Sequence, residues 1–249
     1  MSAVQTYLRS ILAEGHQLLS IGPFDVFVAP DSDHPYANYA IPRDGAEPTQ
    51  EQVRELIAGM EGAGRCPRLE FLPAAAPAAA AALTTAGFTV ERRTPVMTCT
   101  PQTAVEVPAP DGTNLHQLGP EAEGEEVHGL LRALAGAFGE FYDPATEELA
   151  AARLLRRIAV LAYADGDIAG GGSCQAIITG ATELVGIGVI EAHRRRGIAA
   201  AITSELARLA FERGAETAFL TPGDEATARV YERAGFERTD IMLHLVRRS

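Results

Sequence analysis

One segment constrains the fold of this chain more than any other, because an apolar strand, a basic glycine turn and a helix follow one another there. Gly186–Val189 is strand-like and apolar, Arg194–Arg196 places three positive charges in the turn, and Gly197 closes it. From Gly197 to Arg213, apolar side chains recur along one side of a predicted helix. A strand that feeds such a helix through a turn predicts an α/β sheet with helices packed on it.

The same turn is suited to binding a diphosphate. The first turn of a helix leaves N–H groups without intrahelical acceptors, at the positive end of the helix dipole. Gly197 and Ala199 lack bulk, so a phosphate can approach the backbone, and arginines add charge and hydrogen-bond donors. A P-loop is excluded because no GxxxxGK[ST] occurs. A dinucleotide-binding fold is disfavoured because no GxGxxG follows a strand.

The chain divides at a proline-containing stretch, Thr100–Thr113, which predicts an extended connector. Beyond it, strand and helix signals alternate. The expected strands are Leu115–Leu118, Ile158–Ala164, Ile168–Ile178, Thr182–Val189, Thr217–Leu220 and Glu237–Val246, and the expected helices are Glu121–Ala137, Thr146–Arg157, Gly197–Arg213 and Ala226–Ala234.

The first part of the chain echoes the end of the second. Arg68–Pro73 precedes an alanine-rich helix, the tripeptide AGF at Ala86–Phe88 and a strand. Glu216–Pro222 likewise precedes a helix, AGF at Ala234–Phe236 and a strand. The shared order of strand, helix, AGF and strand predicts a structural repeat.

Three segments of the second part, in the right order, resemble the GNAT superfamily, the Gcn5-related N-acetyltransferases. The family's turn, Arg/Gln-x-x-Gly-x-Gly/Ala, is matched by Arg194–Ala199. Gly186–Val189 is similar to its central strand, and Asp224–Phe236 to its helix ending in Tyr-x-x-x-Gly-Phe. The resemblance implies a mixed, mostly antiparallel sheet flanked by helices, with strands that splay after Val189 to admit acetyl-CoA.

The resemblance also implies which residues hold the donor and how the chemistry runs. Its thioester arm would lie on Ile187, Gly188 and Val189, whose N–H groups stabilise the oxyanion. The diphosphate would lie on Arg194, Arg195, Arg196, Gly197, Ile198 and Ala199. Transfer to the amine would be direct, without metal or covalent intermediate.

Two residues are candidates for proton transfer. Tyr231 would protonate the departing thiolate, since a free phenol has a pKa of about 10 and a thiol of about 8.5. Glu183 would take the proton of the incoming amine. Each also has a structural interpretation, Tyr231 as a core aromatic and Glu183 as a solvated carboxylate. Asp224 occupies the place of an asparagine that touches the cofactor in many members.

The resemblance divides the chain into residues 1–105, a smaller, degenerate GNAT-like α/β domain, and residues 113–249, the N-acetyltransferase domain. Leu83 stands where the repeat would place Tyr231, and the first part lacks the basic turn. We therefore expect one cofactor site per chain. The loop with Phe138, Glu140 and Tyr142 would line the acceptor site, although surface packing is an alternative.

Composition limits partners and location. A net charge of −12 disfavours nucleic acid as a binding partner. Three cysteines without a CxxC pair favour neither disulfides nor zinc, and fit a reducing cytoplasm. The start of the chain predicts an ordinary helix, and no apolar run is long enough to span a membrane. A small-molecule or peptide amine is the expected acceptor. The sequence leaves open whether the chain forms a homodimer.

Two other functions are compatible with these residues. The chain could be a regulatory module that binds acyl-CoA without turnover, or a structural domain whose turn binds nothing. Neither the acceptor nor the acyl length follows from the sequence, because a fold does not determine a substrate.

Overall fold

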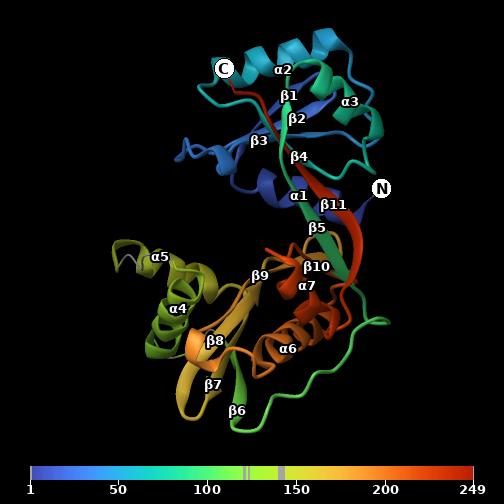
Figure 1. The fold of residues 1–249 in the computed structure, drawn as a ribbon. Helices are drawn as coiled ribbons and strands as arrows, with labels where there is room; N and C mark the ends of the chain where they lie inside the picture. The colour runs from blue at the N-terminus through green and yellow to red at the C-terminus, as the bar shows by residue number, and fades with distance from the viewer. Residues whose placement is uncertain (1, 120–121, 123, 140–143, 249) are drawn as a thin grey trace. The chain divides into compact units, whose positions relative to one another are not determined.

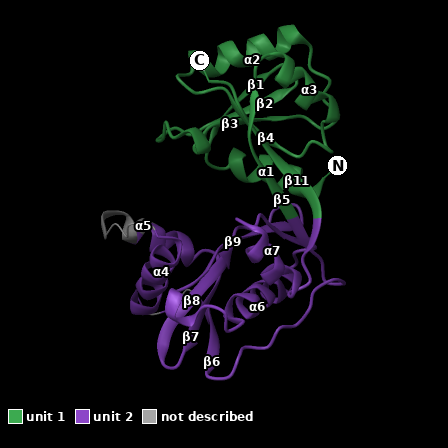
Figure 2. Ribbon diagram, viewed as in Figure 1, with its two compact units in different colours: residues 1–96, 239–249 green, residues 97–238 purple. Residues whose placement is uncertain are grey.

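The computed structural model describes residues 2–119, 122, 124–139 and 144–248, and the chain forms two compact units (Figure 2). Unit 1 comprises Met1–Val96 and Thr239–Ser249, and unit 2 comprises Met97–Arg238. Two strands, β5 (Thr89–Cys99) and β11 (Glu237–Val246), contribute residues to both units. The expected domains, 1–105 and 113–249, remain a prediction.

Unit 1 is a sheet with helices around it (Figure 1). Its strands follow the order β1-β2-β3-β4-β11, with only β3 and β4 parallel among these pairs. Leu243 and Leu245 of β11 share the core with Leu69 and Phe71 of β4. Its other elements are α1 (Ala3–Ala13), β1 (Gln17–Ile21), β2 (Phe24–Val28), η1 (Pro35–Ala37), β3 (Tyr39–Pro42), α2 (Gln50–Gly62), β4 (Arg68–Phe71) and α3 (Pro77–Thr85).

Unit 2 has the strand order β5-β10-β9-β8-β7-β6, in which β9 and β10 are parallel and the other neighbours antiparallel. Helix α6 covers one face of the sheet and α4 with α5 the other (Figure 1). Its elements are β6 (Thr113–Leu118), α4 (Gly124–Phe138), α5 (Pro144–Leu154), β7 (Ile158–Ala164), β8 (Asp167–Cys174), β9 (Ala181–Val189), η2 (Glu191–His193), α6 (Ile198–Glu212), β10 (Thr217–Leu220) and α7 (Glu225–Glu232).

The burial of β7 on both faces explains its unbroken apolar sequence. Val160 and Ala162 belong to the core beneath α6, whereas Ala159 and Leu161 belong to the core beneath α4 and α5. A strand covered on both sides has no face for polar residues. The mixed α/β sheet flanked by helices is therefore confirmed, and most element bounds lie within a few residues of expectation.

Strand β8 is shorter than the expected Ile168–Ile178. Its last pair with β9 is Cys174↔Leu184, after which the Gln175 N–H donates to the Glu183 carbonyl. The chain then reverses at Thr179 and Gly180, which both have positive φ. A strand cannot continue through such a turn, so the pairing ends there.

Helices α3 and α7, which the predicted repeat pairs with each other, end in the same hydrogen bond. The Phe88 N–H donates to the Leu83 carbonyl, as the Phe236 N–H donates to the Tyr231 carbonyl. The intervening Gly87 and Gly235 have φ of 90° and 88°. This left-handed glycine ends each helix and turns the phenylalanine back into its core.

The separation of β9 from β10 begins earlier than the sequence suggested. Their last registered pair is Phe219↔Glu183, six residues before Val189, so the expectation of a splay after Val189 was wrong. Strand β10 ends at Leu220, and Pro222 follows closely without an N–H to donate. The second half of β9 is consequently left without β10 beside it.

We expect Leu243→Ala to destabilise unit 1, because this buried side chain joins β11 to the core of that unit. Truncating a buried leucine costs about 2–5 kcal/mol. Hydrogen exchange should show lost protection in β4. Ile241→Ala, at an exposed position two residues earlier in the same strand, should change stability by under about 0.5 kcal/mol. Equal effects of the two variants would contradict this packing.

Candidate functional site

A cavity of about 630 Å³ lies in unit 2, where β9 is left without its neighbour. The end of α4, residues 187–189 of β9, the basic turn and the start of α6 line it. Helix α7 forms a further wall. Among the cavity-lining residues are Ile187, Gly188, Val189, Arg194, Arg195, Gly197, Ile198, Ala199 and Tyr231, all of which the sequence proposed for the site.

A β-bulge shapes the strand side of the cavity. Between the pairs Gly171↔Gly188 and Ser173↔Val185, β8 has one residue, whereas β9 has two, Gly186 and Ile187. Gly186 has a φ of 63°, which costs a glycine little. The extra residue interrupts the ladder and re-aims the backbone that follows it.

The glycine run Gly170–Gly172, to which sequence reasoning assigned no role, lets β8 approach both of its neighbours, the bulged β9 and β7. A Cβ on Gly170 would lie 2.1 Å from the Gly188 carbonyl oxygen, and one on Gly171 would lie 2.3 Å from the Val160 carbonyl oxygen. Only glycine fits such distances. The run therefore supports the cavity from behind without lining it.

The start of α6 offers free donors to the cavity. Gly197 is its N-cap with a φ of 91°, and no side chain caps this end among the described residues. Arg195 also has a positive φ, 63°. The first N–H groups of α6 therefore lack side-chain partners at the positive end of the helix dipole, which is the arrangement that binds anions.

The three arginines of the turn have different environments. Arg194 donates from Nε to the Val189 carbonyl at 3.0 Å and from Nη2 to the Ala137 carbonyl at 2.8 Å, so it ties β9 to α4. Arg196 binds Asp165 with Nη1 2.5 Å from Oδ2, and does not line the cavity. Arg195 lines the cavity and has no partner among the described residues.

The salt bridge of Arg196 was not foreseen. Asp165 lies in the β7–β8 turn with a φ of 56°, and the guanidinium holds the pKa of its carboxyl below its ordinary value. Arg196 also donates to Nδ1 of His193 at 3.1 Å. Its proposed phosphate contact stays a prediction.

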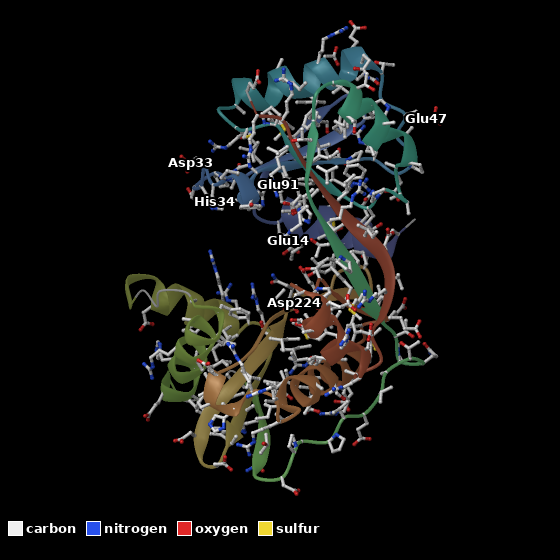
Figure 3. The ribbon with its side chains drawn as sticks, in the orientation of Figure 1. Glu14, Asp33, His34, Glu47, Glu91 and Asp224 are labelled. Carbon is white, nitrogen blue, oxygen red and sulfur yellow. The ribbon has the colours of Figure 1, made fainter. Side chains whose placement is uncertain are left out.

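Tyr231 and Asp224 come from α7. Tyr231 is 8% exposed, and burial, with a smaller effect of the Asp224 charge, raises its pKa to about 12. Asp224, labelled in Figure 3, caps α7. Its carboxylate accepts from the Thr227 N–H at 2.7 Å. Hydrogen bonds from the side chain of Thr227 and, to a smaller extent, from its backbone N–H lower the pKa of Asp224, which is therefore an anion at neutral pH.

Glu183 is half-buried at the last β9–β10 pair, and it is not among the residues that line the cavity. Its role as a base remains a prediction. Phe138, at the end of α4, does line the cavity. Glu140 and Tyr142, the other candidates for the acceptor site, lie outside the described residues.

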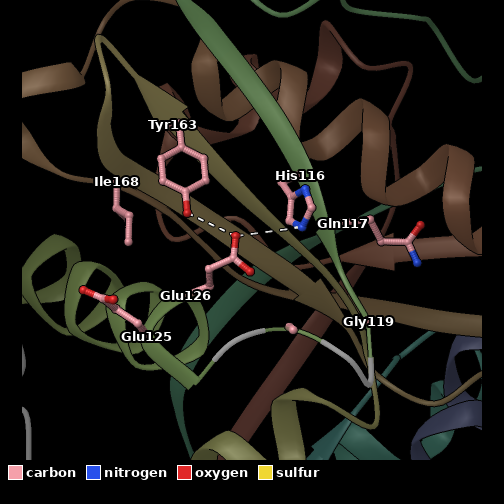
Figure 4. A pocket seen from close by; sticks show the side chains of 8 residues that line it. His116, Gln117, Gly119, Glu125, Glu126, Tyr163 and Ile168 are labelled. Atoms are coloured by element: carbon pink, nitrogen blue, oxygen red, sulfur yellow. Dashed lines mark hydrogen bonds and ion pairs between the residues drawn. The ribbon is translucent and has the colours of Figure 1, made fainter.

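A second cavity, of about 680 Å³, lies near the other end of α4 (Figure 4). There Glu126 accepts from the Tyr163 hydroxyl at 3.2 Å and lies 3.9 Å from Nε2 of His116. Glu125 also lines it. Carboxylates repel phosphate, so the cavity with the basic turn is the better diphosphate site.

Two further searches cover only the residues that the structure describes. Within them, no cluster of three or more His, Cys, Asp or Glu side chains is placed to hold a metal ion. No described helix is both long and apolar enough to cross a membrane.

Comparison with known proteins agrees with this geometry. The sequence model of the acetyltransferase (GNAT) family matches residues 127–236. This segment is a GNAT acetyltransferase domain. It contains most of α4, the bulged β9, the basic turn and Tyr231, which all contribute to the lining of the cavity.

Solved structures share the fold over nearly the whole chain. A GCN5-related N-acetyltransferase from Kribbella flavida has a TM-score of 0.81 at 25% identity, covering 99% of this chain and 95% of that one. One from Sphaerobacter thermophilus has a TM-score of 0.67 at 20% identity, covering 98% and 85%.

A tandem GNAT protein from the clavulanic acid biosynthesis pathway has a TM-score of 0.63 at 14% identity, covering 89% of this chain and 77% of that one. No curated protein matches the chain. The match over residues 127–236 supports acyl-CoA-dependent N-acetyltransferase activity in general, and members of the GNAT family use acetyl-CoA as co-substrate and an amine as acceptor.

We expect the phenol of Tyr231 to ionise about two pH units later than an exposed tyrosine. Because the raised pKa favours the protonated native state, the associated stability is complete below pH 10 and is lost as pH rises through about 12. Ultraviolet titration of the protein minus its Tyr231→Phe variant measures this. Asp224→Asn should lower the midpoint, and an unshifted wild-type midpoint near 10 would contradict the burial argument.

Proposed function

We propose that the chain is an acyl-CoA-dependent N-acyltransferase that transfers an acetyl group from acetyl-CoA to a primary amine by direct attack. One observation carries this proposal. The bulged strand, the uncapped start of α6 and the buried Tyr231 all line a single cavity. Each supplies a different requirement of acyl transfer, namely a carbonyl site, a diphosphate site and a proton donor.

The cavity fits the parts of acetyl-CoA that need polar partners. Backbone N–H groups at the start of α6, with Arg195, would hold the diphosphate. Backbone donors of Ile187–Val189, beyond the bulge, would polarise the thioester carbonyl and stabilise the oxyanion. Bound there, the thioester supplies an activated acyl group.

The proton movements balance with two residues of this chain. The amine nitrogen bonds to the carbonyl carbon, the carbon–sulfur bond breaks, and Tyr231 donates its hydroxyl proton to the thiolate. Its raised pKa keeps this proton in place at neutral pH. Burial also raises the pKa of a thiol, so the departing sulfur in the cavity is more basic than in water.

Glu183 is proposed as the base that removes the amine proton. It stands where the parallel strands part, next to the strand segment that lines the cavity, and so a water molecule would have to relay the proton. The acceptor is proposed to be a small-molecule or peptide amine in the cytoplasm. Residues 1–105 are proposed as the degenerate copy, supported by the repeated helix ends and by Leu83 at the place of Tyr231.

Arg195→Gln should weaken acetyl-CoA binding about tenfold, since a hydrogen bond to a charged group contributes about 1.5–3 kcal/mol. Calorimetry or thermal shift measures it, because a ligand at 100 times its Kd adds about 2.7 kcal/mol of stability. Arg208→Gln, on the exposed side of α6 and paired with Glu205 and Glu212, is the control. Equal losses in both variants would argue against a phosphate contact.

Tyr231→Phe should lower kcat by about 10²- to 10⁴-fold while acetyl-CoA affinity is preserved, because the ring remains and only the proton donor is lost. Thiol release with a panel of amines measures it. Tyr163→Phe removes a hydroxyl at the acidic cavity and should leave kcat unchanged. If acetyl-CoA binds but no amine releases thiol, the regulatory module is the better interpretation.

Glu183→Gln should lower kcat at neutral pH by about 10²-fold, and activity should recover as pH rises, since the amine then loses its proton without a base. The pH–rate profiles of variant and wild type test this. If the rate of the variant is lower than that of the wild type by the same factor at every pH, Glu183 does not act as a base.

A further inference from the structure

The acidic cavity at the start of α4 has no part in the proposed reaction (Figure 4). Side chains of β6, α4, β7 and β8 line it, and it shares no lining residue with the cavity that contains Tyr231. Glu126 and Phe138, which line one cavity each, are twelve residues apart in α4. At a rise of about 1.5 Å per residue they are about 18 Å apart, so the two cavities are separate sites.

The acidic cavity has the size and the mixed lining of a small-molecule site. Its volume is about 680 Å³, and such sites measure about 300–1,000 Å³. Ile168 and the ring of Tyr163 form an apolar part of the wall. This part is closely packed, because a Cβ on Gly129 of α4 would lie 2.4 Å from Cδ1 of Ile168.

The carboxylate of Glu126 is held in place at one of its two oxygens. Its Oε1 accepts from the Tyr163 hydroxyl at 3.2 Å and lies 3.9 Å from Nε2 of His116 (Figure 4). Its Oε2 has no hydrogen bond or ion pair with a described residue. A carboxylate that is already positioned loses less side-chain freedom when a ligand binds to it.

Glu125 supplies a second, separate negative charge. Successive residues of an α-helix point about 100° apart, and Figure 4 shows the Glu125 carboxylate away from that of Glu126. Glu125 has no hydrogen bond or ion pair within the part of the chain that the structure describes. Among the described lining residues, His116 is the only basic one. The cavity therefore presents two anionic points beside an apolar wall.

This arrangement favours an organic cation over other ligands. Anions are repelled by the carboxylates. Described side chains form no cluster of three or more His, Cys, Asp or Glu that could hold a metal ion. An alkylammonium group needs fewer carboxylates, because it donates up to three hydrogen bonds and also binds against the face of an aromatic ring. Two ammonium groups joined by an alkyl chain would use both carboxylates and cover the apolar wall.

We propose that this cavity binds an aliphatic diamine or polyamine, with one ammonium group on Glu126 and another on Glu125. The alkyl chain between them lies against Ile168 and the Tyr163 ring. An amine bound here is distant from Tyr231, so the site is not the acceptor site. The proposal does not depend on the proposed function, since it requires neither acetyl-CoA nor transfer.

Calorimetry on the full chain without acetyl-CoA tests the proposal, with 1,4-diaminobutane as the probe and butylamine as its counterpart with one ammonium group. The diamine should bind the wild type about tenfold more tightly than butylamine, and rising salt should weaken it. Glu126→Gln and Glu125→Gln should each weaken the diamine about tenfold. The amide oxygen of Gln still accepts from the Tyr163 hydroxyl, so Glu126→Gln keeps the local structure.

The double variant Glu51→Gln with Glu55→Gln is the matched control, because it removes two exposed carboxylates from another helix, α2. It should bind the diamine as the wild type does. The proposal is overturned if the wild type binds no diamine, if butylamine binds equally well, or if the control loses as much affinity as the variants of α4. Diamine binding that is insensitive to Glu125→Gln and Glu126→Gln would place the amine elsewhere and also overturn it. If the diamine binds as expected but acetyl-CoA does not bind, only the proposed function fails.

Discussion

The early end of the β9–β10 pairing is the constraint on which the rest of the site depends. Parallel strands normally continue side by side, but these two have no registered pair beyond Glu183 and Phe219. Strand β10 stops before a proline, and β9 is bulged at Gly186. The backbone between the bulge and Val189 therefore faces a cavity, where its donors can serve a ligand.

The bulge has a consequence for the neighbouring strand. Beside the bulge, β9 lies so close to Gly170 and Gly172 of β8 that a side chain there would collide with it. The cavity thus depends on residues that never touch a ligand. Arg194 acts similarly, because it fixes the end of β9 to the end of α4 through two carbonyls.

The three arginines of the turn have different partners, although they are adjacent in the sequence. Arg194 and Arg196 are held by the protein itself, one by backbone carbonyls and the other by Asp165. Arg195 has no such partner among the described residues and lines the cavity, and its backbone is in the left-handed conformation. Arg233, at the end of α7, also lines the cavity. The two glutamates of α7, Glu225 and Glu232, form ion pairs with Arg238.

Local sequence patterns determined the elements of unit 2, the glycine turn before α6 and the repeated AGF helix ends, because helix periodicity, strand apolarity and left-handed glycines act over a few residues. Only the tertiary structure decided where β9 and β10 part, which arginine is free, and which residues of β5 and β11 belong to each unit. Arg233 follows Tyr231 by two positions, yet its place in the cavity could not be read from that spacing. These features depend on contacts between residues far apart in the chain, whose geometry no local pattern contains.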